Sequence, residues 1–202
     1  MSTTGTPAGA TDPRQGVPRR RGGGDIRSMV ISMAVILGIV VAVVWVVPRP
    51  NAIEQPAADV ANAAEGARSR LSFEPPVPQG LEGWTPTSAE VTRSTDDVTT
   101  WHVGYVSAQG SPLALEVARD ATARWQGAYT SNGVEDGTQE VGGLEWQRFR
   151  QDDRSRYSLV REQDGLTVLV AGDADFDELA ELVTATLDGW TAAGVEWGEP
   201  AG

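Results

Sequence analysis

His102 is the only histidine in this chain of 202 residues, which also has no cysteine. Histidine is the usual general base near neutral pH, and it needs a nucleophile and an orienting carboxylate beside it. Glu116 on the next predicted strand is an available carboxylate, since it shares a face with Ala114 and Ala118. No Gly-x-Ser-x-Gly signature accompanies the histidine. We therefore expect His102 to be hydrogen-bonded at a sheet surface, with a hydrolase centred on it as the third-ranked function.

Metal and cofactor chemistry has little support in the sequence. One histidine and no cysteine exclude multi-histidine and thiolate metal sites. The run Asp173-Ala174-Asp175-Phe176-Asp177 has the alternating carboxylates that open an EF-hand loop, but Glu178 stands where glycine is needed and Thr184 where the bidentate glutamate belongs. A helix capping box formed by Asp175 and Glu178 explains the run better. We expect no metal, no cofactor and no catalytic residue.

Tryptophan is the other residue type that could make contacts, because exposed rings stack on sugars and anchor protein partners. Six of the seven tryptophans follow residue 50: Trp84, Trp101, Trp125, Trp146, Trp190 and Trp197. Trp101, Trp125 and Trp190 fall on apolar faces of predicted elements and are expected in the core. Trp84 and Trp197 fall in predicted loops. These two, together with His102, are the residues we expect to contact a ligand or partner.

The charge of the chain is unevenly distributed. The net charge is -12, yet residues 1–27 hold five arginines against two acidic residues. The acidic remainder repels phosphate backbones, so nucleic acid is not an expected partner. The arginines between 148 and 161 are interleaved with acids, and we interpret them as a solvated sheet face, with a local anion site as the alternative.

Residues 29–47 form an uncharged run of 19 residues, followed by Pro48 and Pro50. A helix of this length measures about 29 Å, which matches the hydrocarbon core of a bilayer. Four arginines between 19 and 27 precede it and Arg49 alone follows closely, so the N-terminus is expected in the cytoplasm. The run is too long for a typical signal peptide. The expected localisation is the cell membrane, as a single-pass protein with an extracytoplasmic C-terminal domain.

The remaining organisation follows from composition. We expect a disordered cytoplasmic tail at 1–27, a transmembrane helix at 28–47 in contact with the lipid bilayer, and an extracytoplasmic stalk at 48–70 whose second half is helical. A domain at 71–190 and a C-terminal tail at 191–202 follow.

Within that domain the hydrophobic period changes from helical to alternating. Predicted strands cover residues 86–93, 98–107, 113–118, 144–150, 156–162 and 166–171, and predicted helices cover 120–129, capped by Asp120, and 176–190. Short turns between neighbouring strands favour antiparallel pairing. The predicted fold class is therefore α+β: an N-terminal transmembrane helix followed by an antiparallel sheet packed against one or two helices.

Three short motifs stand in one order along the chain: Arg27-Ser28-Met29, Gly83-Trp84-Thr85-Pro86-Thr87-Ser88 and Trp101-His102-Val103-Gly104-Tyr105. This arrangement resembles an actinobacterial membrane-protein family known as domain of unknown function (DUF) 4245, over residues 27 to about 188. The resemblance implies a single-span envelope protein and adds no activity.

The sequence thus predicts a single-pass protein that is not an enzyme. Its external domain is expected to act as a binding or accessory module for an envelope protein partner. A glycan or small-ligand receptor that uses Trp84 or a cleft between sheet and helix is the alternative.

Overall fold

A computed structural model describes residues 25–46, 57–94, 96–151 and 156–197, with backbone alone for 25–28 and 41–46. Most of the predicted cytoplasmic tail, the first part of the predicted stalk and residues 152–155, between two predicted strands, lie outside these ranges. The chain divides into two units, one ending at Glu54 and one beginning at Gln55.

The first unit contains helix α1 (Asp25–Val46), whose side chains from Met29 to Val40 are exposed. The structure confirms a helix at this place. Among the described residues, however, no helix has both the length and the apolar character needed to cross a bilayer. The assignment of residues 28–47 as a transmembrane helix is thus not supported by the structure.

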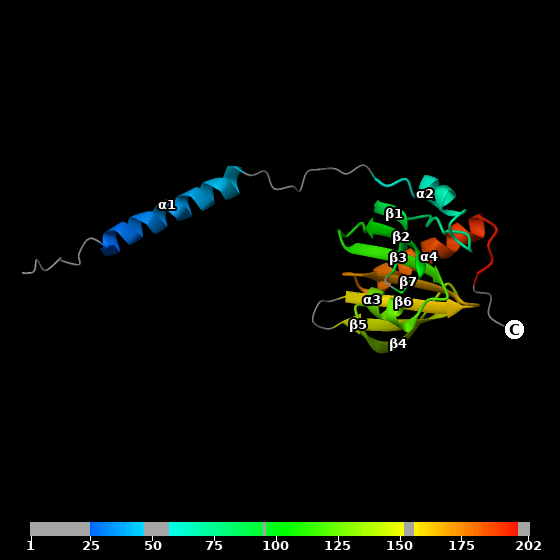
Figure 1. The fold of residues 1–202 in the computed structure, drawn as a ribbon. Helices are drawn as coiled ribbons and strands as arrows, with labels where there is room; N and C mark the ends of the chain where they lie inside the picture. Colours follow the sequence, from blue (N-terminus) through cyan, green and yellow to red (C-terminus); the bar gives the residue numbers. More distant parts are fainter. Residues whose placement is uncertain (1–24, 47–56, 95, 152–155, 198–202) are drawn as a thin grey trace, which may run out of the picture. The chain divides into compact units, whose positions relative to one another are not determined.

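The second unit is built on one seven-stranded antiparallel sheet with the strand order β1-β2-β3-β7-β6-β5-β4 (Figure 1). The strands are β1 (Thr85–Arg93), β2 (Thr99–Val106), β3 (Pro112–Arg119), β4 (Val134–Val141), β5 (Leu144–Gln151), β6 (Arg156–Gln163) and β7 (Leu166–Gly172). Alternating apolar residues and short turns predict the β1–β2, β2–β3 and β6–β7 pairs, whereas β3 and β7 are neighbours in the sheet although they are distant in the sequence. The α+β class with an antiparallel sheet and packed helices is confirmed.

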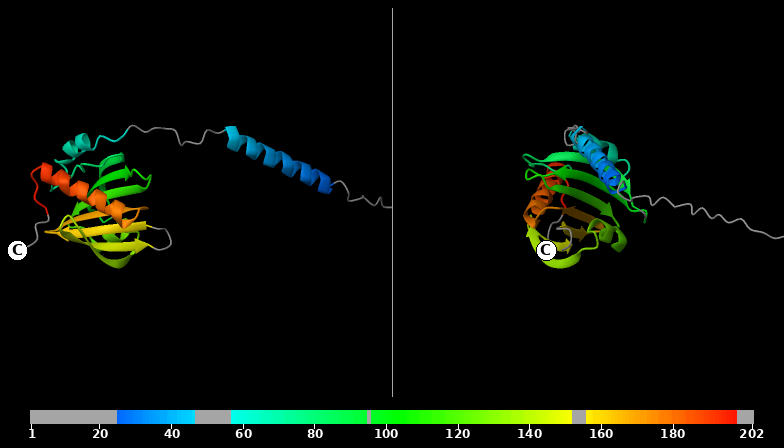
Figure 2. Two further views of the ribbon diagram at one scale, coloured as in Figure 1. Left: turned by 180° about the vertical axis from the view of Figure 1, so that it is seen from behind. Right: turned by 90° about the vertical axis from the view of Figure 1, so that its left-hand side faces the viewer.

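Helices lie on both faces of the sheet (Figure 2). Helix α4 (Phe176–Ala192) covers the face that carries Trp101, Val103 and Leu115, and together they form the main core. Helix α3 (Ala123–Tyr129) covers part of the opposite face, where Trp125 is buried in a second, smaller core. Alternate residues of one strand therefore enter different environments.

Two segments outside the predicted domain boundaries contribute to this core. Helix α2 (Val60–Ala67) buries Val60, Ala64 and Ala67, whose spacing places them on one face. Val195 and Trp197 also pack against the core. Residues 60–67 of the expected stalk and 195–197 of the expected tail thus belong to the domain.

Two local predictions were wrong. Strand β4 was missed because its sequence VEDGTQEV is polar and only Val141 is buried. Helix α3 begins later than predicted and is capped by Thr122, whose hydroxyl accepts from the Trp125 amide at 3.0 Å. Asp120, the predicted cap, adopts a positive φ of 53° and its amide donates to the Gly165 carbonyl at 2.7 Å, so it belongs to a turn.

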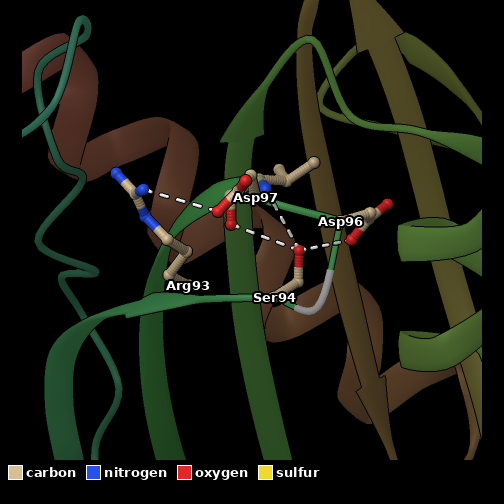
Figure 3. A network of polar contacts seen from close by, with 5 residues as sticks. Arg93, Ser94, Asp96 and Asp97 are labelled. Carbon is tan, nitrogen blue, oxygen red and sulfur yellow. Dashed lines mark hydrogen bonds and ion pairs between the residues drawn. The ribbon is translucent and has the colours of Figure 1, made fainter.

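The turn between β1 and β2 has its own polar network (Figure 3). Ser94 donates to Asp96 at 2.5 Å and accepts from the Val98 amide at 3.2 Å. Thr122 also donates to Asp96, and these two hydrogen bonds lower the pKa of Asp96. The ionised carboxylate thereby ties this turn to the first residue before α3.

Candidate functional site

Trp84 lies on the wall of a cleft of about 560 Å³ between residues 79–84 and helix α4. Its ring is half-buried and meets the Tyr105 ring edge to face, with centroids 6.2 Å apart. Tyr105 points to the α4 side of the sheet and is itself buried. The ring of Trp84 is therefore fixed from one side while the cleft remains open on the other.

Three long-range hydrogen bonds hold the segment before Trp84 in place, one to β2 and two to α4. The Trp101 indole donates to the Pro76 carbonyl at 3.1 Å, and the Trp190 indole donates to the Glu74 carbonyl at 2.8 Å. The Gln79 amide donates to the Ala185 carbonyl at 2.9 Å. Gly189 permits this approach, because a Cβ there would lie 2.1 Å from the Val77 carbonyl oxygen.

Among the described residues, four carboxylates and no arginine line the cleft: Glu82, Asp177, Glu181 and Asp188. Three of them recur along α4 at intervals of four and seven residues, which places them on one face of the helix. An aromatic wall beside several carboxylates suits a positively charged group, which is attracted by both.

His102 lies on the opposite face of the sheet, in contact with a hydroxyl and a carboxylate. Its Nδ1 is 2.7 Å from Glu116 Oε1, and its Nε2 is 3.1 Å from Ser88 Oγ. An ionised carboxylate can only accept, so Nδ1 carries the proton and Nε2 of the neutral ring accepts from the serine hydroxyl. The expected carboxylate partner is confirmed.

The carboxylate is the most deeply buried member of this chain of hydrogen bonds. The Glu116 side chain is 4% exposed and the His102 side chain 24% exposed, while Ser88 is half-buried. The hydrogen bond to Glu116 raises the pKa of His102, against the opposing effect of its burial. Burial raises the pKa of Glu116, and its hydrogen bond with His102 opposes that rise. The carboxylate therefore stabilises the protonated ring.

Gly104 allows the hydroxyl to reach His102. A Cβ at Gly104 would lie 2.6 Å from Ser88 Oγ and 2.8 Å from Thr87 Oγ1. The pairing of β1 with β2 shifts register between Pro86 and Ser88, which makes Thr87 the extra residue of a β-bulge. The bulge and the glycine together bring two hydroxyls over one backbone position.

Trp197 lies near the C-terminal end of α4, away from both groups. Its ring packs at 5.9 Å from the Trp146 ring and 5.3 Å from the Trp190 ring. It also borders a separate cleft of about 360 Å³ with Phe73 and Glu74. The three predicted contact residues, Trp84, His102 and Trp197, thus lie in three different places.

Comparison with known families decides the membership of the chain. Residues 21–186 match the family model described as protein of unknown function (DUF4245). The chain belongs to the DUF4245 family. No curated protein matches the sequence.

In this DUF4245 chain the start of α4 is capped as the sequence predicts, but Glu178 does not complete a capping box. The Asp175 side chain accepts from the amides of Asp177 and Glu178. The buried Glu178 carboxylate instead accepts from Ser107 at 2.5 Å and from Ser111 at 3.0 Å, which ties the β2–β3 turn to α4. Within the described ranges, no group of three or more histidine, aspartate or glutamate side chains is arranged to hold a metal ion.

The arginines of β5 and β6 are engaged within the domain. Arg148 pairs with Asp136 at 3.2 Å and stacks on the Phe176 ring at 3.7 Å, and Arg156 pairs with Asp173 at 3.4 Å. Each of these two arginines is thus paired with an aspartate, which disfavours the alternative of an anion site there.

Sequence reasoning missed Ser88 and the acidic lining of the cleft. The short distance between Ser88 and His102 depends on the bulge at Thr87. The only sequence signal for this bulge was the pair of neighbouring hydroxyl residues, Thr87 and Ser88, on the strand that faces Gly104. The acidic stripe of α4 was visible as helical spacing, but the loop that faces it is brought there only by the tertiary structure.

Proposed function

We propose that this DUF4245 protein is anchored in the cell membrane and that its external domain binds a cationic group in the cleft beside Trp84. The cationic group is best supplied by lysine or arginine side chains of an envelope protein partner. The observation that carries the proposal is the cleft itself, whose described lining has an aromatic wall, four carboxylates and no arginine. Such a site attracts cations from a distance and holds them by contact with the ring.

The anchor rests on the sequence. The uncharged run at 29–47 has the length of a bilayer core. The arginines before it favour a cytoplasmic N-terminus. On this basis the domain faces the cell envelope.

The absence of cysteine permits a clean test of the anchor. Ser2→Cys and Ser69→Cys are made singly in the full chain and treated in intact cells with a membrane-impermeant maleimide. We expect Ser69→Cys to be labelled in intact cells and Ser2→Cys to be labelled only after the cells are opened. Labelling of both in intact cells, or release of the chain from membranes by carbonate, would refute the anchor.

Binding is tested by photocrosslinking in living cells from position 184, whose threonine is exposed on α4 and lines the cleft. The test variant neutralises three lining acids as Asp177→Asn, Glu181→Gln and Asp188→Asn. The matched control neutralises three exposed acids elsewhere, as Glu65→Gln, Glu140→Gln and Glu162→Gln. We expect the crosslinked partner to disappear in the test variant alone and to diminish with added salt. Equal loss in both variants, or no loss in either, would contradict the proposal.

A small ligand is the second candidate, because about 560 Å³ lies within the range of small-molecule sites. Titration of Trp fluorescence with a lysine-rich peptide, with spermidine and with a cell-wall disaccharide distinguishes the cases. A saturable change with the peptide alone supports a protein partner. Saturation with spermidine supports a small amine ligand, and saturation with the disaccharide supports a glycan.

A further inference from the structure

We propose that Ser88, His102 and Glu116 form a nucleophile, base and carboxylate relay that activates Ser88 for attack on carboxylic esters. This site lies on the face of the sheet opposite the Trp84 cleft and is independent of ligand binding there. Nucleophilic serine sites are recognised by geometry rather than by sequence position. The hydroxyl, imidazole and carboxylate are in the required order, joined by distances of 3.1 and 2.7 Å.

The relay is partly buried and consists of two connected hydrogen bonds. The carboxylate end is 4% exposed, and its second oxygen, Glu116 Oε2, has no hydrogen-bond partner among the described residues. Burying a carboxylate that has only one oxygen hydrogen-bonded is unfavourable. In exchange, the carboxylate holds the imidazole in one orientation with its proton on Nδ1. A surface histidine with a purely structural role does not require such a partner.

The backbone around Ser88 also departs from regular sheet geometry in a way that serves the hydroxyl. The bulge at Thr87 and the missing side chain at Gly104 place Ser88 Oγ and Thr87 Oγ1 within 3 Å of the same point. Bulges are frequent next to active sites, where they re-aim a side chain. Thr87 is exposed, and we assign its hydroxyl as a donor to the developing oxyanion, because it lies beside the Ser88 hydroxyl.

The chemical step is an acyl transfer to Ser88 followed by hydrolysis. The Ser88 oxygen bonds to the ester carbonyl carbon as its proton passes to His102 Nε2. The carbon–alkoxy bond then breaks, and the leaving alcohol takes that proton. Water attacks the acyl-serine, gives one proton to Nε2, and the serine oxygen leaves and recovers it, so that ester and water yield acid and alcohol.

The charges around the site favour neutral or cationic esters. Glu90 is exposed and stands directly opposite His102 in the β1–β2 pairing. Glu116 lies behind the ring from β3, and Arg156 acts on Glu116 from a distance. Tyr129 of α3 lies near enough to feel the Glu116 charge, and burial raises the pKa of this phenol. The carboxylates of Glu90 and Glu116 would therefore repel an anionic ester that approaches Ser88.

A cysteine replacement tests the relay without knowledge of the substrate. Ser88→Cys introduces the only thiol in the chain, and its reaction with iodoacetamide is followed from pH 5 to 10 in the full chain. A thiol paired with a protonated imidazole ionises well below the ordinary pKa of about 8.5. We expect the midpoint of the Ser88→Cys profile to lie at least about one pH unit below that of the exposed control Ser69→Cys.

Two double variants show whether the relay causes the lowered pH midpoint of the Ser88→Cys thiol. Adding His102→Gln to Ser88→Cys is expected to return the midpoint to the control value, and adding Glu116→Gln to move it part of the way. Unfolding curves monitored by tryptophan fluorescence show whether each variant is folded. Equal midpoints for Ser88→Cys and Ser69→Cys, or a shift that persists without His102, would overturn the proposal.

The unmodified serine is tested with p-nitrophenyl acetate and with a fluorophosphonate. We expect labelling at Ser88, located by peptide mass spectrometry, and ester hydrolysis that Ser88→Ala and His102→Gln reduce about a hundredfold or more. Ser69→Ala is expected to leave both unchanged. Labelling that is spread over many hydroxyls, or hydrolysis unaffected by Ser88→Ala, would show that the hydroxyl is not activated.

Discussion

Gly189 is the position at which the wall of the Trp84 cleft depends on the absence of a single methyl group. In the Gly189→Ala variant the new Cβ would lie 2.1 Å from the Val77 carbonyl oxygen and 2.8 Å from its carbon. Both atoms belong to backbone, so a side-chain rotation cannot relieve the contact. Residues 77–79 must move away from α4 by more than about 1 Å to restore an ordinary van der Waals distance.

The expected loss of stability follows from the contacts that hold this segment. Moving it strains or breaks the hydrogen bonds Gln79–Ala185 and Trp190–Glu74, each of which contributes about 1 kcal/mol. Overpacking adds about 1–3 kcal/mol, and the better helix propensity of alanine recovers about 1 kcal/mol. The net effect is a destabilisation of about 3 kcal/mol, or about 10 °C in Tm for a domain of this size.

Urea unfolding followed by tryptophan fluorescence measures this effect. Gly66→Ala is the matched control, because Gly66 lies in helix α2 and a Cβ at this position would have no atom within 4 Å. There, alanine is expected to stabilise by up to about 1 kcal/mol. If Gly189→Ala is as stable as Gly66→Ala, the close approach of residues 77–79 to α4 does not exist in solution, and the cleft is not formed as described.

Three further predictions concern the polar groups of the domain. Glu178→Ala leaves the hydroxyls of its two serine partners without their acceptor and is expected to lower the free energy of unfolding by about 2 kcal/mol, whereas Asp188→Ala at an exposed position of the same helix changes it by less than about 0.5 kcal/mol. Asp175→Ala removes the cap of α4 and is expected to cost about 1 kcal/mol in the same urea assay, and an unchanged midpoint would contradict that role. The pKa of His102 is raised in the folded state by its hydrogen bond to Glu116, so the stability that the protonated ring contributes is complete below the unfolded pKa of about 6.5 and is lost as the pH rises through the folded pKa. The difference in unfolding free energy between wild type and His102→Gln is therefore expected to fall from pH 5.5 to pH 8.5, and a constant difference would refute the coupling.

The sheet was predictable where local signals agree with tertiary structure. The short turn between β2 and β3 fixes their register, so Glu116 could be placed beside His102 from alternation, and the observed pairing of these two residues confirms it. The cap at Asp175 follows from local chemistry in the same way. These features depend on neighbours only a few residues distant, or on one hairpin.

Features that depend on distant contacts were not predictable. Asp120 has the side chain of a good cap, yet its hydrogen bond to Gly165 holds it in a turn and leaves that role to Thr122. Strand β4 lies at the sheet edge, where few side chains are buried, so its sequence lacks alternation. The bulge at Thr87 changes the register by one residue, and alternation then predicts the wrong neighbours for Ser88.

The motif Trp-His-Val-Gly-Tyr at 101–105 connects both proposed sites through one strand. Successive side chains of a strand point to opposite faces, and here the first and last hold the cleft, since the Trp101 indole binds the Pro76 carbonyl and the Tyr105 ring supports Trp84. The second and fourth residues serve the other face, where His102 takes part in the relay and Gly104 leaves room for the serine hydroxyl. A motif that served only one face would need defined side chains only at alternate positions. Here residues on both faces are involved, so β2 constrains both sites. We therefore expect Gly104→Ala to abolish the low pH midpoint of the Ser88→Cys thiol while ligand binding beside Trp84 is retained.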